Sequence, residues 1–164
     1  MKRIFLSLGS NLGDREANLR DALRRLEAPR LHIKRLSSFY ETEPLELAGQ
    51  PWFLNIVAEA ETSLFPMMLL NHCQQVEREM GRKKTVLKGP RKIDVDILLY
   101  GHFVVNTARL RIPHEKMHER RFVIEPMVEL APDLPHPVKR KTMLDLFAGV
   151  KGQAARRLPR SVPS

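Results

Sequence analysis

The sequence has very little cysteine and no long apolar segment. Cys73 is the one cysteine among 164 residues, so a disulfide within the chain and a cysteine-based zinc site are both excluded. No segment approaches the roughly 20 apolar residues of a membrane span. The basic and apolar start of the chain stops at Gly9-Ser10-Asn11 without the small-residue cleavage site of a signal peptide. We therefore expect a cytoplasmic protein that makes no membrane contact.

Acidic residues are absent from two segments that are rich in lysine and arginine. Residues 82–92 hold six basic residues and residues 150–164 hold four, with no Asp or Glu in either, and the net charge is +9. Such clusters favour polyanions, which include nucleic acid, anionic lipid and nucleoside polyphosphates. Composition alone leaves these three partners open.

The pattern of apolar residues predicts one α+β domain. Alternation at 4–8, 31–40, 53–61 and 93–100 indicates strands. The apolar residues after Asp14, a predicted N-cap, have the spacing of a helix. A second helix is expected from Pro66 to the C-terminal cap at Gly81. The order β-α-β-β-α-β is that of a ferredoxin-like sandwich.

The remaining sequence predicts smaller additions to this core. We expect a hairpin that turns at Gly101-His102 into residues 103–106, then short segments punctuated by proline, and a small helix near Thr142, which has capping-box spacing with Asp145. The fold class is thus a ferredoxin-like βαββαβ sandwich with additional C-terminal strands and short helices. The domain is expected to span residues 1–149, followed by a basic, disordered tail at 150–164.

Asp94 and Asp96 are the residues whose pattern points most directly to chemistry. Residues two apart on a strand point to the same face, roughly 7 Å apart. Two neighbouring carboxylates beside a basic loop suit Mg²⁺, which prefers a few carboxylates together with phosphate oxygens. The alternatives are a solvated strand face or ion pairs with nearby Lys and Arg. The adjoining basic residues favour the metal, because phosphoryl transfer depends on neutralising oxygen charge.

The turn Gly9-Ser10-Asn11-Leu12-Gly13-Asp14 lies between a predicted strand and a predicted helix, where phosphate-binding loops occur. It lacks the Gly-Lys-Ser/Thr ending of a P-loop, and Asp14 would repel a phosphate there. We therefore interpret this turn as mainly structural.

Five motifs in order carry a resemblance to a known family. They are Gly9 to Asp14, Phe39-Tyr40-Glu41-Thr42-Glu43-Pro44-Leu45, Gln50-Pro51-Trp52-Phe53-Leu54-Asn55, Gly89-Pro90-Arg91-Lys92-Ile93-Asp94-Val95-Asp96-Ile97 and Ile112-Pro113-His114. Together they resemble the 6-hydroxymethyl-7,8-dihydropterin pyrophosphokinases of folate biosynthesis, from about residue 4 to about residue 135. The resemblance implies transfer of the diphosphate of ATP to the pterin hydroxyl, with release of AMP.

The resemblance also implies roles for individual residues. Two Mg²⁺ ions would be bound by Asp94 and Asp96, and Arg82 and Arg91 would act on the phosphates. The implied pterin contacts are Thr42, Pro44, Leu45, Phe53, Asn55 and Phe122, with the two phenylalanines sandwiching the ring. The implied ATP contacts are Gln74, Glu77, Arg91, Ile97, Arg109, His114 and Arg120. A monomer with ATP and the pterin as its partners, and with no nucleic acid, is expected.

Lys88 departs from the family pattern, which commonly has Trp immediately before Gly-Pro-Arg. A lysine can add charge near phosphates but does not stack on a pterin as an indole does. Arg111 and Arg121 also replace smaller residues that are familiar at these places, and both add positive charge.

Two other functions compete with this one. An RNA-recognition domain needs aromatics at set positions on two central strands. The strands at 4–8 and 93–100 offer only Phe5 and Tyr100, and the two aspartates would repel a phosphate backbone. A regulatory domain that binds a small molecule without catalysis is disfavoured by the Asp pair beside Arg91.

Overall fold

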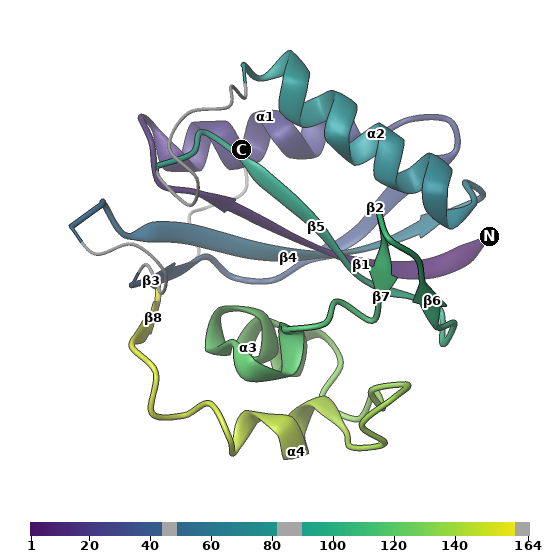
Figure 1. The fold of residues 1–164 in the computed structure, drawn as a ribbon. Helices are drawn as coiled ribbons and strands as arrows, with labels where there is room; N and C mark the ends of the chain where they lie inside the picture. The colour runs from purple at the N-terminus through teal and green to yellow at the C-terminus, as the bar shows by residue number, and fades with distance from the viewer. Residues whose placement is uncertain (44–48, 82–89, 160–164) are drawn as a thin grey trace.

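The protein is a mixed α/β domain whose central antiparallel sheet has helices on both faces (Figure 1). The computed structural model describes residues 1–43, 49–81 and 90–159. The sheet strands in this part of the chain are β1 (Lys2–Ser10), β2 (Leu31–Leu36), β3 (Tyr40–Thr42), β4 (Phe53–Thr62), β5 (Asp94–Tyr100) and β8 (Ala155–Arg157). They run in the order β5-β1-β4-β3-β8, and β2 also pairs with β4.

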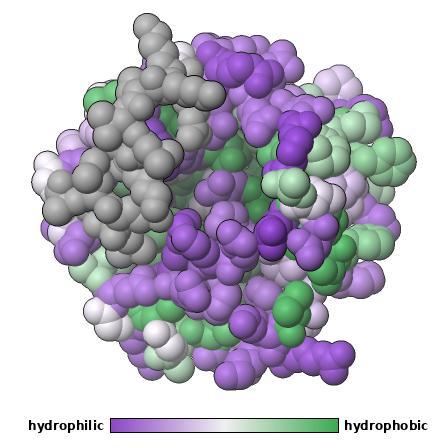
Figure 2. All heavy atoms as spheres, in the orientation of Figure 1, coloured by the Kyte–Doolittle hydropathy of each residue, from purple (hydrophilic) through white to green (hydrophobic). Residues whose placement is uncertain are grey.

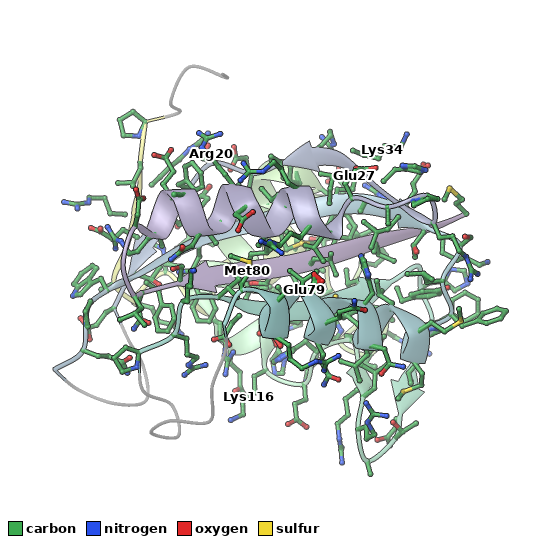
Figure 3. All side chains as sticks on the ribbon, turned by 90° about the horizontal axis from the view of Figure 1, so that it is seen from above. Arg20, Glu27, Lys34, Glu79, Met80 and Lys116 are labelled. Atoms are coloured by element: carbon green, nitrogen blue, oxygen red, sulfur yellow. The ribbon has the colours of Figure 1, made fainter. Side chains whose placement is uncertain are left out.

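Two helices cover one face of the sheet. They are α1 (Arg15–Leu26) and α2 (Pro66–Glu79), and they lie side by side over it in Figure 3, with Glu79 and Met80 between them. Strand alternation sends Ile4, Leu6 and Leu8 of β1 into the core beneath these helices. The predicted helix starts are confirmed: Asp14 accepts from the Ala17 amide at 3.1 Å, and Pro66 opens α2. Helix α2 ends at Glu79 with Met80 as its C-cap, and the predicted Gly81 follows directly with a φ of 87°.

The opposite face carries the helices α3 (Arg121–Leu130) and α4 (Met143–Phe147), preceded by a 3-10 turn at Met117–Glu119. Phe5 and Leu98 point to this side and pack with Val123, Ile124 and Met127 of α3 in a second hydrophobic cluster. The capping box predicted at Thr142 and Asp145 is confirmed. The sequence pattern does not predict helix α3, because Pro126 lies inside it.

Two predictions are wrong, one about the pairing of a short strand and one about disorder near the C-terminus. Residues 103–106 do not form a hairpin with the preceding strand; instead β6 (Val105–Asn106) pairs with β7 (Arg111–Ile112). Residues 155–157 of the expected disordered tail form β8, which pairs with β3. Arg156 bonds to Glu41, and Arg157 contacts Glu129 at 3.1 Å. The carboxylates of Glu41 and Glu129, from distant parts of the chain, thus hold a basic segment that has few apolar side chains of its own.

Most of the surface seen in Figure 2 is hydrophilic, and its hydrophobic residues lie in separate small groups. In the part of the chain that the structure describes, no helix is long and apolar enough to cross a bilayer.

Glu129 on α3 connects this helix to the sheet, and its replacement is expected to lower stability. Its carboxylate accepts from the Ser38 amide and hydroxyl and from the Tyr40 hydroxyl, at 2.8 to 2.9 Å. Burial acts to raise the pKa of Glu129, but these donors and Arg157 outweigh it and hold the pKa below its usual value. Glu129→Gln presents an amide nitrogen to these donors and should cost about 1–3 kcal/mol.

The pH dependence of that cost follows from the lowered pKa of Glu129. The stabilisation is complete above the unfolded carboxyl pKa of about 4.3 and is lost as the pH falls through the lower folded value. Urea unfolding at pH 7 and at pH 3 should therefore show a large difference between wild type and Glu129→Gln at pH 7 and a smaller one at pH 3. An equal difference at both pH values would contradict a charged role for Glu129.

Candidate functional site

The candidate site lies on the α3 side of the sheet, at the end where β1 finishes and β4 begins. Cross-strand register places Tyr40, Asn55, Gly9 and Asp94 in one row, on β3, β4, β1 and β5 respectively. A second row holds Val57, Ser7 and Asp96. Because neighbouring strands are about 4.8 Å apart, Asn55 and Asp94 are separated by roughly 10 Å with Gly9 between them.

Gly9 leaves the middle of that row without a side chain. A Cβ atom at this position would lie 2.8 Å from Asn55 Oδ1 and 3.5 Å from the Phe53 ring. Asn55 itself is buried and donates from Nδ2 to Thr42 Oγ1 at 2.6 Å. Thr42, Phe53 and Asn55 are thus brought together beside the backbone of Gly9, and their contact with a pterin stays a prediction.

Asp94 and Asp96 alternate with the buried Val95 and Ile97 on β5. Val95 and Ile97 belong to the core beneath α1 and α2, so the two aspartates face the other way and are only partly buried. The Ile97 side chain lies in that core, which leaves its backbone as the part of the residue that can face a ligand.

Arg91 connects the two halves of the site. Its Nη1 lies 2.6 Å from Asp94 Oδ2, and its guanidinium carbon lies 5.7 Å from the centre of the Phe53 ring. Its backbone is held by Asn11, whose Oδ1 accepts from the Arg91 amide at 2.7 Å. The arginine therefore lies between the carboxylate pair and the aromatic residue.

Asn11 is a site residue that the sequence interpretation did not single out. Besides holding Arg91, its side chain donates to Gln50 Oε1 at 2.8 Å and to the Pro51 carbonyl at 3.1 Å. Asn11 therefore links three chain segments. Its position inside the Gly9–Asp14 turn is the only sequence signal for this role, and the interpretation of that turn as structural agrees with these bonds.

Glu77 and His114 line the outer edge of β5, which is the last strand of the sheet on that side. Glu77 is buried, and its Oε2 accepts from the Val95 amide at 2.9 Å. The His114 amide donates to the Leu98 carbonyl at 3.0 Å. Burial lowers the pKa of the His114 imidazole, and Asp96 opposes that shift. Burial, with the negative Glu77 and Asp96 nearby, raises the pKa of the Cys73 thiol, so this cysteine is unreactive.

Arg109, Arg120 and Phe122 surround this edge less closely. Arg109 Nη2 reaches Asn71 Oδ1 at 3.3 Å and Gln74 Oε1 at 3.5 Å, which joins the segment between β6 and β7 to α2. The Arg120 guanidinium lies 5.4 Å from the Phe122 ring, and Phe122 packs partly against the second hydrophobic cluster. The pairing of Phe122 with Phe53 around a ligand stays a prediction. Arg82, Pro44, Leu45 and Lys88 lie outside the described residues.

Asp94 and Asp96 can supply part of a metal's ligand shell. Among residues 1–43, 49–81 and 90–159, no three His, Cys, Asp or Glu side chains gather as a metal site. The pair of half-buried carboxylates fits a hard cation such as Mg²⁺, which takes one or two carboxylates and completes its shell with water and substrate phosphates.

Comparison with known proteins identifies the family. A protein-family model described as 7,8-dihydro-6-hydroxymethylpterin-pyrophosphokinase (HPPK) matches residues 5–132. The chain belongs to this family. An HPPK-family relative from Aquifex aeolicus, a 2-amino-4-hydroxy-6-hydroxymethyldihydropteridine pyrophosphokinase, is 41% identical over 143 residues, which cover 87% of this chain and 89% of that protein.

Some of the proteins that this chain resembles are much longer than it is. The folic acid synthesis protein fol1 of Schizosaccharomyces pombe is 42% identical over 94% of this chain, but the chain spans only about a fifth (21%) of that protein. An HPPK-DHPS crystal structure from Plasmodium falciparum has a TM-score of 0.74 at 14% identity and covers 95% of this chain and 46% of its own. That likeness shows the fold alone.

Proposed function

We propose that this protein transfers the diphosphate of ATP to 6-hydroxymethyl-7,8-dihydropterin, which gives AMP and the pterin diphosphate in folate biosynthesis. Membership of the HPPK family supports the reaction. The observation that carries the proposal in the structure is the position of Arg91, which contacts Asp94 of the carboxylate pair and the face of Phe53. The Arg91 side chain therefore links Asp94, which suits a metal bound to phosphate, with Phe53, which suits a flat ring.

The pterin is assigned to the row of Thr42, Asn55 and Gly9. The Asn55 amide can both donate to and accept from the edge of a pterin, and Phe53 offers a face for stacking. The ring would lie against Phe53 and Asn55, whose side chains reach over the backbone of Gly9. The assignment also includes Phe122, Pro44 and Leu45, and these three rest on the sequence resemblance alone.

ATP is assigned to the outer edge of β5, the last strand of the sheet on that side, between α2 and the β6–β7 segment. Gln74, Arg109, His114 and Arg120 border this edge, while Arg82 is assigned from its motif. Glu77 contributes by holding the Val95 amide, which fixes the strand between the two aspartates. Ile97 contributes through its backbone.

The reaction is an in-line displacement at the β-phosphorus. The pterin hydroxyl oxygen forms the new P–O bond and its proton is released to water, the bond from the β-phosphorus to the oxygen of the α-phosphate breaks, and AMP leaves with that oxygen. Arg91 and Arg82 are placed to stabilise charge on the phosphates as it moves to AMP. When bound to Asp94 and Asp96, two Mg²⁺ ions would supply further neutralisation of phosphate charge. No side chain is assigned as general base.

Two further assignments belong to this proposal. The strand order β5-β1-β4, with β2 and β3 both beside β4, supports a ferredoxin-like description of the core. We also infer that the protein acts as a monomer, which light scattering at assay concentration tests directly.

Analysis of the nucleotide product tests the proposed reaction. The protein is incubated with ATP and Mg²⁺, with and without 6-hydroxymethyl-7,8-dihydropterin. AMP that depends on the pterin is the expected result. ADP would mean an ordinary kinase or ATPase reaction, and absence of turnover despite binding of Mg-ATP would mean that this member of the family is not catalytic.

Gly9→Ala should separate binding of the pterin from binding of ATP. The new methyl group would push Asn55 Oδ1 away from its position, because 2.8 Å is too close for a carbon–oxygen contact. The loss of one hydrogen bond to the pterin is expected to raise its KM about tenfold, with the KM for ATP unchanged. Gly152→Ala is the matched control, since nothing lies within 4 Å of its added Cβ. An equal rise in both KM values would contradict the assignment.

A further inference from the structure

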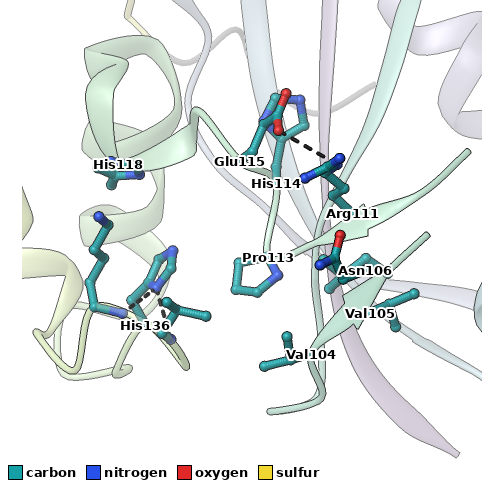
Figure 4. Close-up of a pocket in the computed structure, with 12 residues that line it drawn as sticks. Val104, Val105, Asn106, Arg111, Pro113, His114, Glu115, His118 and His136 are labelled. Atoms are coloured by element: carbon teal, nitrogen blue, oxygen red, sulfur yellow. Dashed lines mark hydrogen bonds and ion pairs between the residues drawn. The ribbon is translucent and has the colours of Figure 1, made fainter. Parts of the chain in front are cut away.

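A cavity lies between the β6–β7 pair and the segment that joins α3 to α4 (Figure 4). Its volume is about 270 Å³, close to the lower limit for small-molecule sites. Apolar side chains make much of its wall, namely Val104, Val105, Ile112, Pro113 and Val138. None of the predicted pterin contacts lines it, and of the predicted ATP contacts only His114 does.

His136 at the wall of this cavity has an unused hydrogen-bond donor. The residue is 4% exposed, and its Nε2 has no hydrogen-bond partner among the described residues. Nδ1 accepts from the amides of Val138 at 3.2 Å and Lys139 at 3.0 Å. Because Nδ1 is used as an acceptor, the proton of the neutral ring lies on Nε2.

The neutral state of this ring follows from its surroundings. Burial, together with the neighbouring His118 and Lys139, lowers the pKa of His136 to about 4. In Figure 4 the Nε2 side of the ring points away from the two dashed bonds, toward the space between His118 and Pro113. A buried donor without an acceptor is uncommon in folded proteins and calls for an acceptor in that space.

The charges at the rim indicate which acceptor fits. Arg111 and Lys139 are two exposed cations, and Glu115, 3.7 Å from Arg111, is the carboxylate that opposes them. The rim is therefore positive by about one charge, while the interior is mostly apolar.

We propose that this cavity binds a small carboxylate with an apolar body, whose oxygen accepts from His136 Nε2 while its body lies between the valines and Pro113. The cavity shares His114 with the proposed ATP position and shares no residue with the proposed pterin position, and its occupancy does not depend on catalysis. Its ligand would be of fragment size, because the cavity is too small for a nucleotide.

Titration with sodium benzoate tests this site in the full chain without substrates. The ring ¹⁵N and ¹H signals of His136 are followed by NMR, and benzamide serves as an uncharged probe of the same shape. We expect saturable shifts with a Kd on the order of 1 mM, as suits a ligand of this size. Binding of benzamide is expected to be weaker. A His136 signal that responds to neither probe would mean that water alone satisfies Nε2, and the proposal would fail.

Two variants assign the binding to this cavity. His136→Asn keeps an acceptor in the place of Nδ1 and removes the Nε2 donor, so benzoate should bind at least about tenfold more weakly, as followed in both variants by the backbone amide signals of Val138 and Lys139. Val104→Phe fills the mouth from an exposed position and should also weaken binding, which keeps the test valid if His136→Asn does not fold. Unchanged benzoate affinity in Val104→Phe, or displacement of benzoate by ATP, would contradict the proposal that benzoate binds in this cavity and apart from ATP.

Discussion

Replacement of either aspartate of β5 by asparagine is expected to abolish most of the proposed pyrophosphokinase activity. Asp94→Asn and Asp96→Asn each keep the size of the side chain and remove its charge. Loss of a carboxylate that holds a metal against phosphates removes several kcal/mol of transition-state stabilisation, and each ~1.36 kcal/mol is a factor of ten. We therefore expect kcat/KM to fall by about 10³-fold or more in each variant.

The folded state should survive these substitutions, which makes the result interpretable. In Asp94→Asn the amide oxygen of the new side chain can still accept from Arg91, and both positions are only partly buried. The control is Asp21→Asn on α1, which loses only exposed pairs with Arg24 and Arg25. Activity is measured as pterin-dependent AMP over a range of Mg²⁺ concentrations. A loss of less than about tenfold in both variants would show that this pair does not carry the charge stabilisation assigned to it.

The elements that could be predicted from the sequence are those whose signals are local. Strand β1 carries Ile4, Leu6 and Leu8 at a period of two, α1 begins after a capping aspartate, and α2 begins at Pro66. The carboxylate pair could be predicted in the same way, because Asp94 and Asp96 share a face of the strand through its period of two alone. The cross-strand row that joins Asn55, Gly9 and Asp94 needs the pairing of three strands, and periodicity does not specify that register.

Helix α3 and strand β8 escaped prediction because their stability comes from distant contacts. Pro126 has no amide proton and disfavours a helix interior. Burial of the apolar face of α3 against the second face of the sheet outweighs that cost. Strand β8 has no apolar alternation; its two arginines find Glu41 and Glu129, which lie 115 and 28 residues earlier in the chain.

Arg91→Ala is expected to impair both halves of the site at once. The substitution removes the 2.6 Å contact with Asp94 and the guanidinium from the Phe53 ring, while the backbone bonds between residue 91 and Asn11 remain. Loss of a preorganised donor to phosphate charge costs about 10²–10³-fold in kcat at comparable sites, and we expect a decrease of that order. The KM for the pterin should also rise, because Phe53 loses its neighbour.

Arg91→Lys distinguishes charge from shape. Lysine restores a positive charge but lacks the planar fork that can hold Asp94 and lie on an aromatic ring at the same time. We expect it to recover part of kcat and little of the pterin KM, with Arg24→Ala on the exposed face of α1 as the control. If Arg91→Lys matched wild type in both constants, Arg91 would act as a point charge alone. The structural link between the carboxylate pair and the aromatic half would then have no part in catalysis.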